Sequence, residues 1–123
     1  MFDAKEKSIG MELRLIRTAR GESLNKAATG MGIGESYLSE IERMKRNPSD
    51  DVINCIAKYY SLDEKYLFDR YGRVPLTVQS EIIKNDALSR TLYEISTNNN
   101  LADEEKEKLY NAIEALYKSH ISR

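Results

Sequence analysis

Apolar residues recur every three or four positions along most of this 123-residue chain, and no strand-length stretch alternates apolar with polar residues. The first spacing lines one face of a helix, whereas two-residue alternation is typical of a strand. Six glycines and two prolines suffice for short turns between helices. The pattern therefore predicts an all-α protein.

The composition excludes several classes of protein. Hydrophobic residues make up 41% of the chain and charged residues 32%, which is typical of a globular protein. No apolar run is long enough to cross a bilayer, and the N-terminus lacks an apolar signal-peptide core, so we expect a cytoplasmic protein with no membrane partner. The single cysteine, Cys55, and the single histidine, His120, exclude an internal disulfide and a Cys/His zinc site. We expect no metal and no cofactor.

Five helices are predicted in the first 70 residues, over 6–20, 24–31, 35–43, 50–60 and 64–69. Ser23, Ser49 and Asp63 precede three of them and are expected N-caps. Gly21 follows the first helix, and the sequence Asn47-Pro48 disfavours helix between the third and the fourth. The expected core residues are Ile9, Leu13, Ile16, Ala19, Leu24, Ala27, Ala28, Met31, Tyr37, Leu38, Ile41, Ile53, Ile56, Ala57, Tyr60, Leu67 and Phe68.

The segment 71–76 contains Gly72 and Pro75 and is predicted as a linker between a domain at 1–70 and a tail at 77–121. Thr77 is the expected cap of the first tail helix, which Asn85-Asp86 can split with Asp86 as a second cap. A turn is expected at 97–100, followed by a helix over 101–119. The apolar tail residues are Val78, Ile82, Leu88, Leu92, Ile95, Leu109, Ile113 and Leu116.

This tail is too small to bury both apolar faces by itself. Two copies packing together would join the stripes into one four-helix core, so the sequence predicts a homodimer, or a higher even-numbered oligomer, held by the apolar tail residues. The alternative is that the tail folds back on the first and fifth helices, with Tyr93, Tyr110 and Tyr117 covering the domain.

Two short helices joined by a glycine turn form a helix-turn-helix layout, in which the second helix enters the DNA major groove. Residues 9–68 resemble the Xre/Cro/cI-type helix-turn-helix of bacterial and phage repressors. The matching residues are Ser23-Leu24, Ala28, Gly32-Ile33, Ser36-Tyr37-Leu38-Ser39, Ile41-Glu42-Arg43 and Asn47-Pro48-Ser49. The whole layout is similar to the SinR-type repressors. The resemblance implies a five-helix, lambda-repressor-like DNA-binding domain, followed by a two-helix oligomerisation tail.

The resemblance also implies which residues touch DNA. Base contacts fall on Glu35, Ser36, Ser39 and Glu40. Phosphate contacts fall on Ser23, Asn25, Lys26, Arg43, Lys45 and Arg46. A further backbone contact from Arg14 or Arg17 is implied, and Arg14, Arg17 and Arg20 form either a phosphate stripe or a solvated helix face.

Charge gives no general argument for DNA, because residues 1–70 hold 12 basic and 12 acidic side chains. Binding must therefore come from a local basic cluster, with the acids elsewhere. Glu35 and Glu40 are unusual on a reading edge, since carboxylates repel phosphate but accept a hydrogen bond from cytosine N4. Either both read cytosine, or one lies outside the groove and discourages non-specific binding.

The expected function is sequence-specific binding of double-stranded DNA, as a repressor that occupies a palindromic operator on the nucleoid. Two alternatives stay open: the antitoxin of a toxin–antitoxin pair, and a protein-interaction adaptor that no longer touches DNA. An anti-repressor protein docking on the tail is a further possible partner. No Ser–His or Cys–His pairing is in prospect, so an enzyme is not expected.

Overall fold

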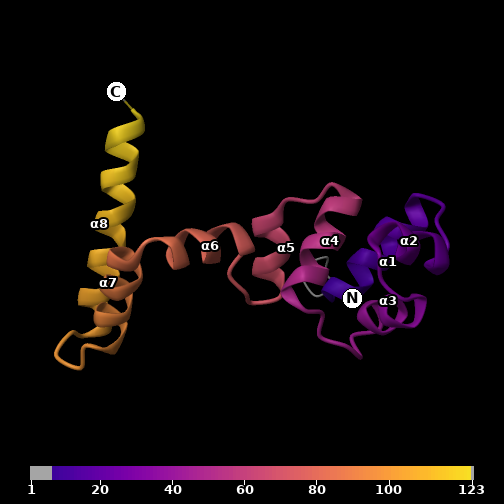
Figure 1. Ribbon diagram of the computed structural model, residues 1–123, viewed down its shortest axis with the longest axis horizontal. Helices are drawn as coiled ribbons and strands as arrows, with labels where there is room; N and C mark the ends of the chain where they lie inside the picture. The colour runs from indigo at the N-terminus through magenta and orange to yellow at the C-terminus, as the bar shows by residue number, and fades with distance from the viewer. Residues whose placement is uncertain (1–6, 123) are drawn as a thin grey trace. The chain divides into compact units, whose positions relative to one another are not determined.

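The computed structural model describes residues 7–122, and all regular secondary structure in this range is helical. The helices are α1 (Ile9–Ala19), α2 (Leu24–Met31), α3 (Glu35–Glu42), α4 (Asp50–Tyr60), α5 (Glu64–Arg70), α6 (Leu76–Lys84), α7 (Asp86–Thr97) and α8 (Asp103–Ile121) (Figure 1). The chain divides into two compact units, Met1–Gln79 and Ser80–Arg123. The all-α fold class is confirmed. The first six residues of the predicted domain lie outside the described range.

Side-chain caps start most helices of the first unit. The hydroxyl oxygens of Ser23 and Ser49 accept hydrogen bonds from backbone N–H groups three residues on, as does the Asp63 carboxylate. These three predicted caps are confirmed. Ser8 caps α1 in the same way, which explains why the helix starts at Ile9 rather than at the predicted residue 6. Each cap satisfies a backbone donor that has no partner within its helix.

A single apolar core holds α1–α5 together. Leu13 of α1, Leu38 of α3 and Phe68 of α5 are fully buried. The other buried apolar residues are Ile9, Ala27, Ala28, Met31, Ile41, Ile53, Ile56, Ala57, Tyr60 and Leu67, with Ile16, Leu24 and Tyr37 packed against them. The predicted core is therefore confirmed except for Ala19, which is exposed at the last position of α1. This core fixes α2 and α3 on the domain.

Gly10 allows α1 to lie directly against the end of α3. A Cβ atom at this position would lie 2.4 Å from the carbonyl oxygen of Glu42 and 2.7 Å from that of Ile41. Both atoms belong to the backbone, so no side-chain rotation relieves the clash. The helices would have to separate to accommodate any other residue.

We therefore expect Gly10→Ala to lower the free energy of unfolding by about 1–3 kcal/mol, the usual range for overpacking a tight contact. Helix propensity acts in the opposite direction, since alanine is favoured over glycine by about 1 kcal/mol. Urea unfolding followed by circular dichroism measures the change. Thr18→Ala, at an exposed position of the same helix, is the control and should stay within about 0.5 kcal/mol of the parent. A Gly10→Ala protein more stable than the parent would refute the close approach.

The segment after α5 packs on the first unit. Arg73 Nη1 lies 3.1 Å from Asp50 Oδ1, and Gln79 Nε2 donates to the other oxygen of the same carboxylate over 3.2 Å. Together these bonds hold the pKa of Asp50 below its usual value, the bond from Gln79 contributing most. The predicted linker 71–76 therefore lies within the first unit, and the division of the chain falls inside α6.

Two expected tail caps differ from the structure. Thr77 is the second residue of α6, and its hydroxyl donates to the Glu64 carboxylate instead. The predicted break between two tail helices is confirmed, but Asn85 caps α7 rather than Asp86, because its side-chain oxygen accepts the Leu88 N–H over 3.0 Å. Asp86 is the first residue of α7 and pairs with Arg90.

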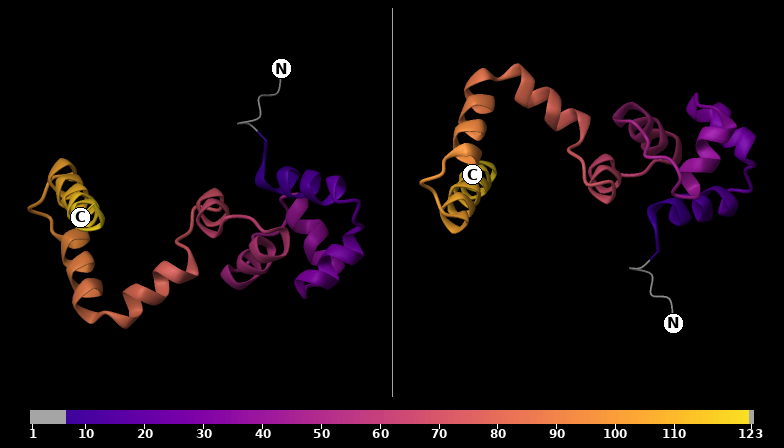
Figure 2. Two further views of the ribbon diagram at one scale, coloured as in Figure 1. Left: turned by 90° about the horizontal axis from the view of Figure 1, so that it is seen from above. Right: turned by 90° about the horizontal axis from the view of Figure 1, so that it is seen from below.

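The second unit consists of the last turns of α6, followed by α7 and α8, which a short loop connects (Figure 2). Lys106 Nζ donates to the carbonyl oxygen of Ser96 over 3.1 Å and joins α7 to α8. No residue of α7 or α8 is buried. Among the described helices none has the length and apolar character needed to cross a membrane.

Candidate nucleic-acid interface

The helix pair α2–α3 presents one polar face outward. Gly32 ends α2 with φ at 78°, a left-handed conformation that glycine adopts without strain, and the chain turns into α3. Leu38 and Ile41 of α3 are buried in the core. Glu35 and Ser36 are consequently exposed at the start of α3, where a recognition helix contacts base edges.

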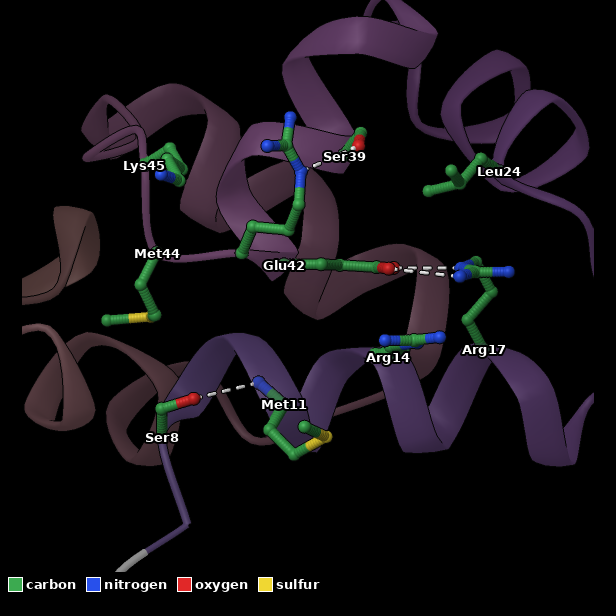
Figure 3. Close-up of a pocket in the computed structure, with 10 residues that line it drawn as sticks. Ser8, Met11, Arg14, Arg17, Leu24, Ser39, Glu42, Met44 and Lys45 are labelled. Carbon is green, nitrogen blue, oxygen red and sulfur yellow. Dashed lines mark hydrogen bonds and ion pairs between the residues drawn. The ribbon is translucent and has the colours of Figure 1, made fainter.

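A buried ion pair joins α1 to the end of α3. Arg17 Nε donates to Glu42 Oε2 over 2.8 Å and Arg17 Nη2 to Glu42 Oε1 over 3.0 Å, so the pair is bidentate (Figure 3). The side chains are only 11% and 4% exposed. Arg17 Nη1 also donates to the carbonyl oxygen of Glu22. Arg17 therefore joins α1 to α3, and of the two residues implied for a backbone contact from α1, Arg14 or Arg17, the structure gives an internal ion pair to Arg17.

Arg20 also has an internal partner. Its Nε lies 2.6 Å from Glu22 Oε1, and its guanidinium lies over the rings of Tyr59 and Tyr60. The Tyr59 hydroxyl donates to the other oxygen of Glu22, and this bond, more than the arginine, holds the pKa of the carboxyl below its usual value. Two of the three arginines are therefore engaged within the domain, so Arg14, Arg17 and Arg20 form neither a uniform phosphate stripe nor a uniform solvated face.

Gly30 explains how Tyr59 reaches this cluster. A Cβ atom on Gly30 would lie 2.2 Å from Cε1 of the Tyr59 ring. The glycine in the last turn of α2, which costs helix propensity, therefore leaves room for an aromatic side chain of α4.

Six of the ten carboxylates between residues 7 and 79 are in ion pairs with basic residues, namely Glu12, Glu22, Glu40, Glu42, Asp50 and Asp69. By contrast, Arg14, Lys26, Arg43 and Lys45 form no ion pair within residues 7–122. Each ion pair neutralises one carboxylate and one cation, and the four cations that remain around α2 and α3 outnumber the one carboxylate there without an ion pair among the described residues, that of Glu35. Such a local basic surface attracts phosphate.

Three of these cations line one hollow. Arg14, Arg43 and Lys45 contribute to a hollow of about 610 Å³ between α1 and the end of α3, and its other charged residues are the paired Arg17 and Glu42 (Figure 3). A second hollow, of about 310 Å³, lies over α3. Leu24, Ser39 and Arg43 line both. The exposed face of α3 thus continues into the basic hollow without a break.

The other predicted base-contacting residues, Glu35, Ser39 and Glu40, differ in how strongly they bond to neighbouring side chains. Glu35 makes one long contact, since Asn25 Nδ2 lies 3.5 Å from its Oε2. Ser39 accepts a hydrogen bond from Arg43 Nε over 3.2 Å. The Glu40 carboxylate is 3.0 Å from Arg46 Nε.

The turn after α3 sets the position of Lys45. Met44 adopts a left-handed conformation with φ at 59°, and the N–H of Lys45 then donates to the carbonyl oxygen of Glu40 over 2.8 Å. This is the bonding pattern that ends many helices. It places the basic residues Arg43, Lys45 and Arg46 beside the end of α3.

Sequence reasoning missed the role of the Arg17–Glu42 pair, although a signal was present. Arg17 lies four residues after Leu13, and Glu42 lies four residues after Leu38. Both charged residues therefore extend the buried stripe of their own helix. Two opposite charges on two buried stripes indicate a buried ion pair, because an unpaired charge there would be too costly.

Comparison with known proteins identifies the same region. A helix-turn-helix family model, HTH_3, matches residues 13–67. The HTH-type transcriptional regulator SlrR of Bacillus subtilis (strain 168) is 37% identical over 62 residues, which cover 50% of this chain and 41% of SlrR. ImmR, an HTH-type transcriptional regulator of the same strain, is 29% identical over 87 residues, covering 71% of this chain and 64% of ImmR.

A third relative comes from Mycobacterium tuberculosis (strain ATCC 25618 / H37Rv). Its HTH-type transcriptional regulator Rv0474 is 32% identical over 73 residues, covering 59% of this chain and 52% of Rv0474. The chain thus spans between 41% and 64% of the length of these relatives. No solved structure matches the chain significantly. The match to the helix-turn-helix model, the glycine turn between α2 and α3 and the exposed face of α3 all fall on one segment, so residues 13–67 are similar to a helix-turn-helix domain.

Proposed function

We propose that this protein is a sequence-specific DNA-binding transcriptional regulator that represses by occupying a palindromic operator as a dimer. The observation that carries the proposal is the set of cations around the exposed face of α3 that form no ion pair within residues 7–122, namely Arg14, Lys26, Arg43 and Lys45. The names of its relatives support regulation rather than catalysis. The site of action would be the nucleoid in the cytoplasm.

In this proposal α3 lies in the major groove. Ser36 and Ser39 face the base edges, because they lie on the side of α3 away from Leu38 and Ile41, and Glu35 joins them from the exposed first position of the helix. A serine hydroxyl both donates and accepts, so it can bond to several bases, whereas a carboxylate selects the cytosine amino group.

Phosphate contacts flank this edge on both sides. Ser23, Asn25 and Lys26 lie at the start of α2, where exposed backbone donors and the helix dipole also favour an anion. Arg43 and Lys45 lie at the other end of α3. Arg14, which forms no ion pair among the described residues, joins them from α1. These contacts fix the register on DNA, and the base contacts specify the sequence.

The tail would supply the dimer contact. Val78, Leu88, Leu109, Ile113 and Leu116 are between 39% and 74% exposed, and Ile82, Leu92 and Ile95 are half-buried. Apolar residues repeated along three helices with no buried position in α7 or α8 have no core of their own. A second copy of the same tail would cover them and bring two recognition helices to one operator.

The proposal is tested by changing one predicted base contact and one predicted phosphate contact. An operator selected by the full chain from random duplexes provides the reference, and binding is then measured to all its single-base variants. Ser36→Ala should lose about 1–3 kcal/mol of discrimination at the base pair it reads. Lys45→Ala should weaken binding to every variant alike, because phosphate contacts carry no sequence information. If Ser36→Ala leaves the preference profile unchanged, the reading edge is misplaced.

A further inference from the structure

Arg46 is held at two places on the surface beside α3. Its Nε lies 3.0 Å from Oε2 of Glu40, and the two side chains are 51% and 35% exposed. Its guanidinium also lies over the ring of Tyr37, 4.8 Å from the ring centre. The Tyr37 hydroxyl in turn accepts the backbone N–H of Ser49 over 3.4 Å, which ties the ring to the start of α4. Arg46 therefore has a carboxylate at its edge and an aromatic ring at its face.

The neighbouring cations have no such restraint. Arg43 bonds only to the neutral Ser39 hydroxyl, and Lys45 has no ion pair within residues 7–122. Three basic residues follow one another closely after α3, and one of them alone is matched with an acid. The pairing therefore distinguishes Arg46 from the residues beside it.

We infer that Glu40 is an intramolecular counterion that competes with DNA phosphate for Arg46 and so weakens binding to DNA of any sequence. The inference rests on the proposed function. A phosphate can bind Arg46 only if it displaces the Glu40 carboxylate or shares the Arg46 guanidinium with it. The negative charge of Glu40 also repels the DNA backbone. Glu40 then acts on specificity without reading a base, because it lowers the sequence-independent part of the affinity.

The geometry favours this role over cytosine recognition. The charge-assisted contact to Arg46 already engages one oxygen of Glu40, and the side chain is about two-thirds covered. A reading residue must be free to reach the base edge, as the exposed Ser36 is. Glu35, the other acid of α3, has only the long contact with Asn25, so it keeps the reading role.

The test uses the full chain and a 20-base-pair duplex of mixed sequence at several salt concentrations. Glu40→Gln should raise affinity about two- to fivefold at low salt, the range that exposed ion pairs contribute. The log–log salt slope should steepen by about 0.9 per subunit, because one more phosphate contact forms. Arg46→Ala alone should change affinity little, but in the Glu40→Gln protein it should cancel most of the gain, leaving only the part that comes from removing the repulsion between Glu40 and phosphate. Glu35→Gln, which removes the same charge from the same helix, is the control, and its effect should not depend on Arg46.

Three results would overturn the inference. Glu40→Gln has no effect, or it raises affinity equally when Arg46 is alanine, or it alters preference at one operator base pair with an unchanged salt slope. The last outcome would assign Glu40 to base reading. A parent chain that binds no duplex even at low salt would refute the proposed function together with the inference, whereas a parent that binds and shows no coupling refutes the inference alone.

Discussion

Replacement of Glu42 by alanine is expected to destabilise the N-terminal unit by about 3–5 kcal/mol, because it leaves the Arg17 guanidinium buried without its partner. Both side chains are almost fully covered, and both guanidinium–carboxylate hydrogen bonds are lost together. Arg17→Ala should cost a similar amount, since the uncompensated charge is then the carboxylate. The free energy of unfolding from urea titrations of each variant measures the effect.

Two further variants test whether the loss of stability comes from the unpaired buried charge. Arg14→Ala removes an arginine from the same helix that makes no ion pair within residues 7–122, and it should change stability by no more than about 0.5 kcal/mol. The double variant Arg17→Met/Glu42→Leu, which replaces the pair by apolar residues, should recover most of the loss. If Glu42→Ala unfolds at the same urea concentration as the parent, the pair does not join α1 to α3 in solution.

Loss of the tail is expected to reduce operator affinity by about 100-fold or more, because two recognition helices would no longer be linked. The chain is truncated after Lys84, which keeps the whole first unit and its contacts to Gln79. Light scattering should show a dimer or a higher even oligomer for the full chain and a monomer for the truncated one. The competing interpretation, in which the tail covers its own domain, predicts a monomeric full chain instead.

A point substitution tests the same interface without truncation. Ile113→Lys places a charge on the exposed apolar stripe of α8 and should dissociate the oligomer while the helical content stays unchanged. Asn111→Lys adds the same charge on the opposite side of α8 and should leave the oligomer intact. Dissociation by both variants, or by neither, would exclude this stripe as the interface.

Local sequence signals were enough to predict the five helices of the first unit and most of its core. Ser23, Ser49 and Asp63 mark helix starts through bonds to residues three positions on, and apolar spacing defines the inner faces. Such interactions depend on neighbours in the sequence. They can be recognised without knowledge of how the helices pack together.

Interactions between helices were harder to predict. Arg17 and Glu42 are 25 residues apart in the sequence. The sequence of α1 alone therefore allows Arg17 to be exposed, and only the packing of α3 against α1 shows that it is paired. Gly10 gave no local signal, because its role depends on two carbonyl oxygens at the end of α3. The partner of Glu40 was also hard to predict, although it is close in sequence. Arg46 lies in the loop after α3, where the spacing of helical contacts no longer applies.

The central claim is that the cations with no ion pair within residues 7–122 bind the DNA backbone, and the salt dependence of operator affinity tests it most directly. Arg14, Lys26, Arg43 and Lys45 would give about four phosphate contacts per subunit, so a dimer should show a log–log slope near −7. Affinity should then fall about 10⁴-fold between 50 and 200 mM salt, as the same relation requires. An affinity that does not change with salt, or no binding to any duplex at low salt, would contradict the account.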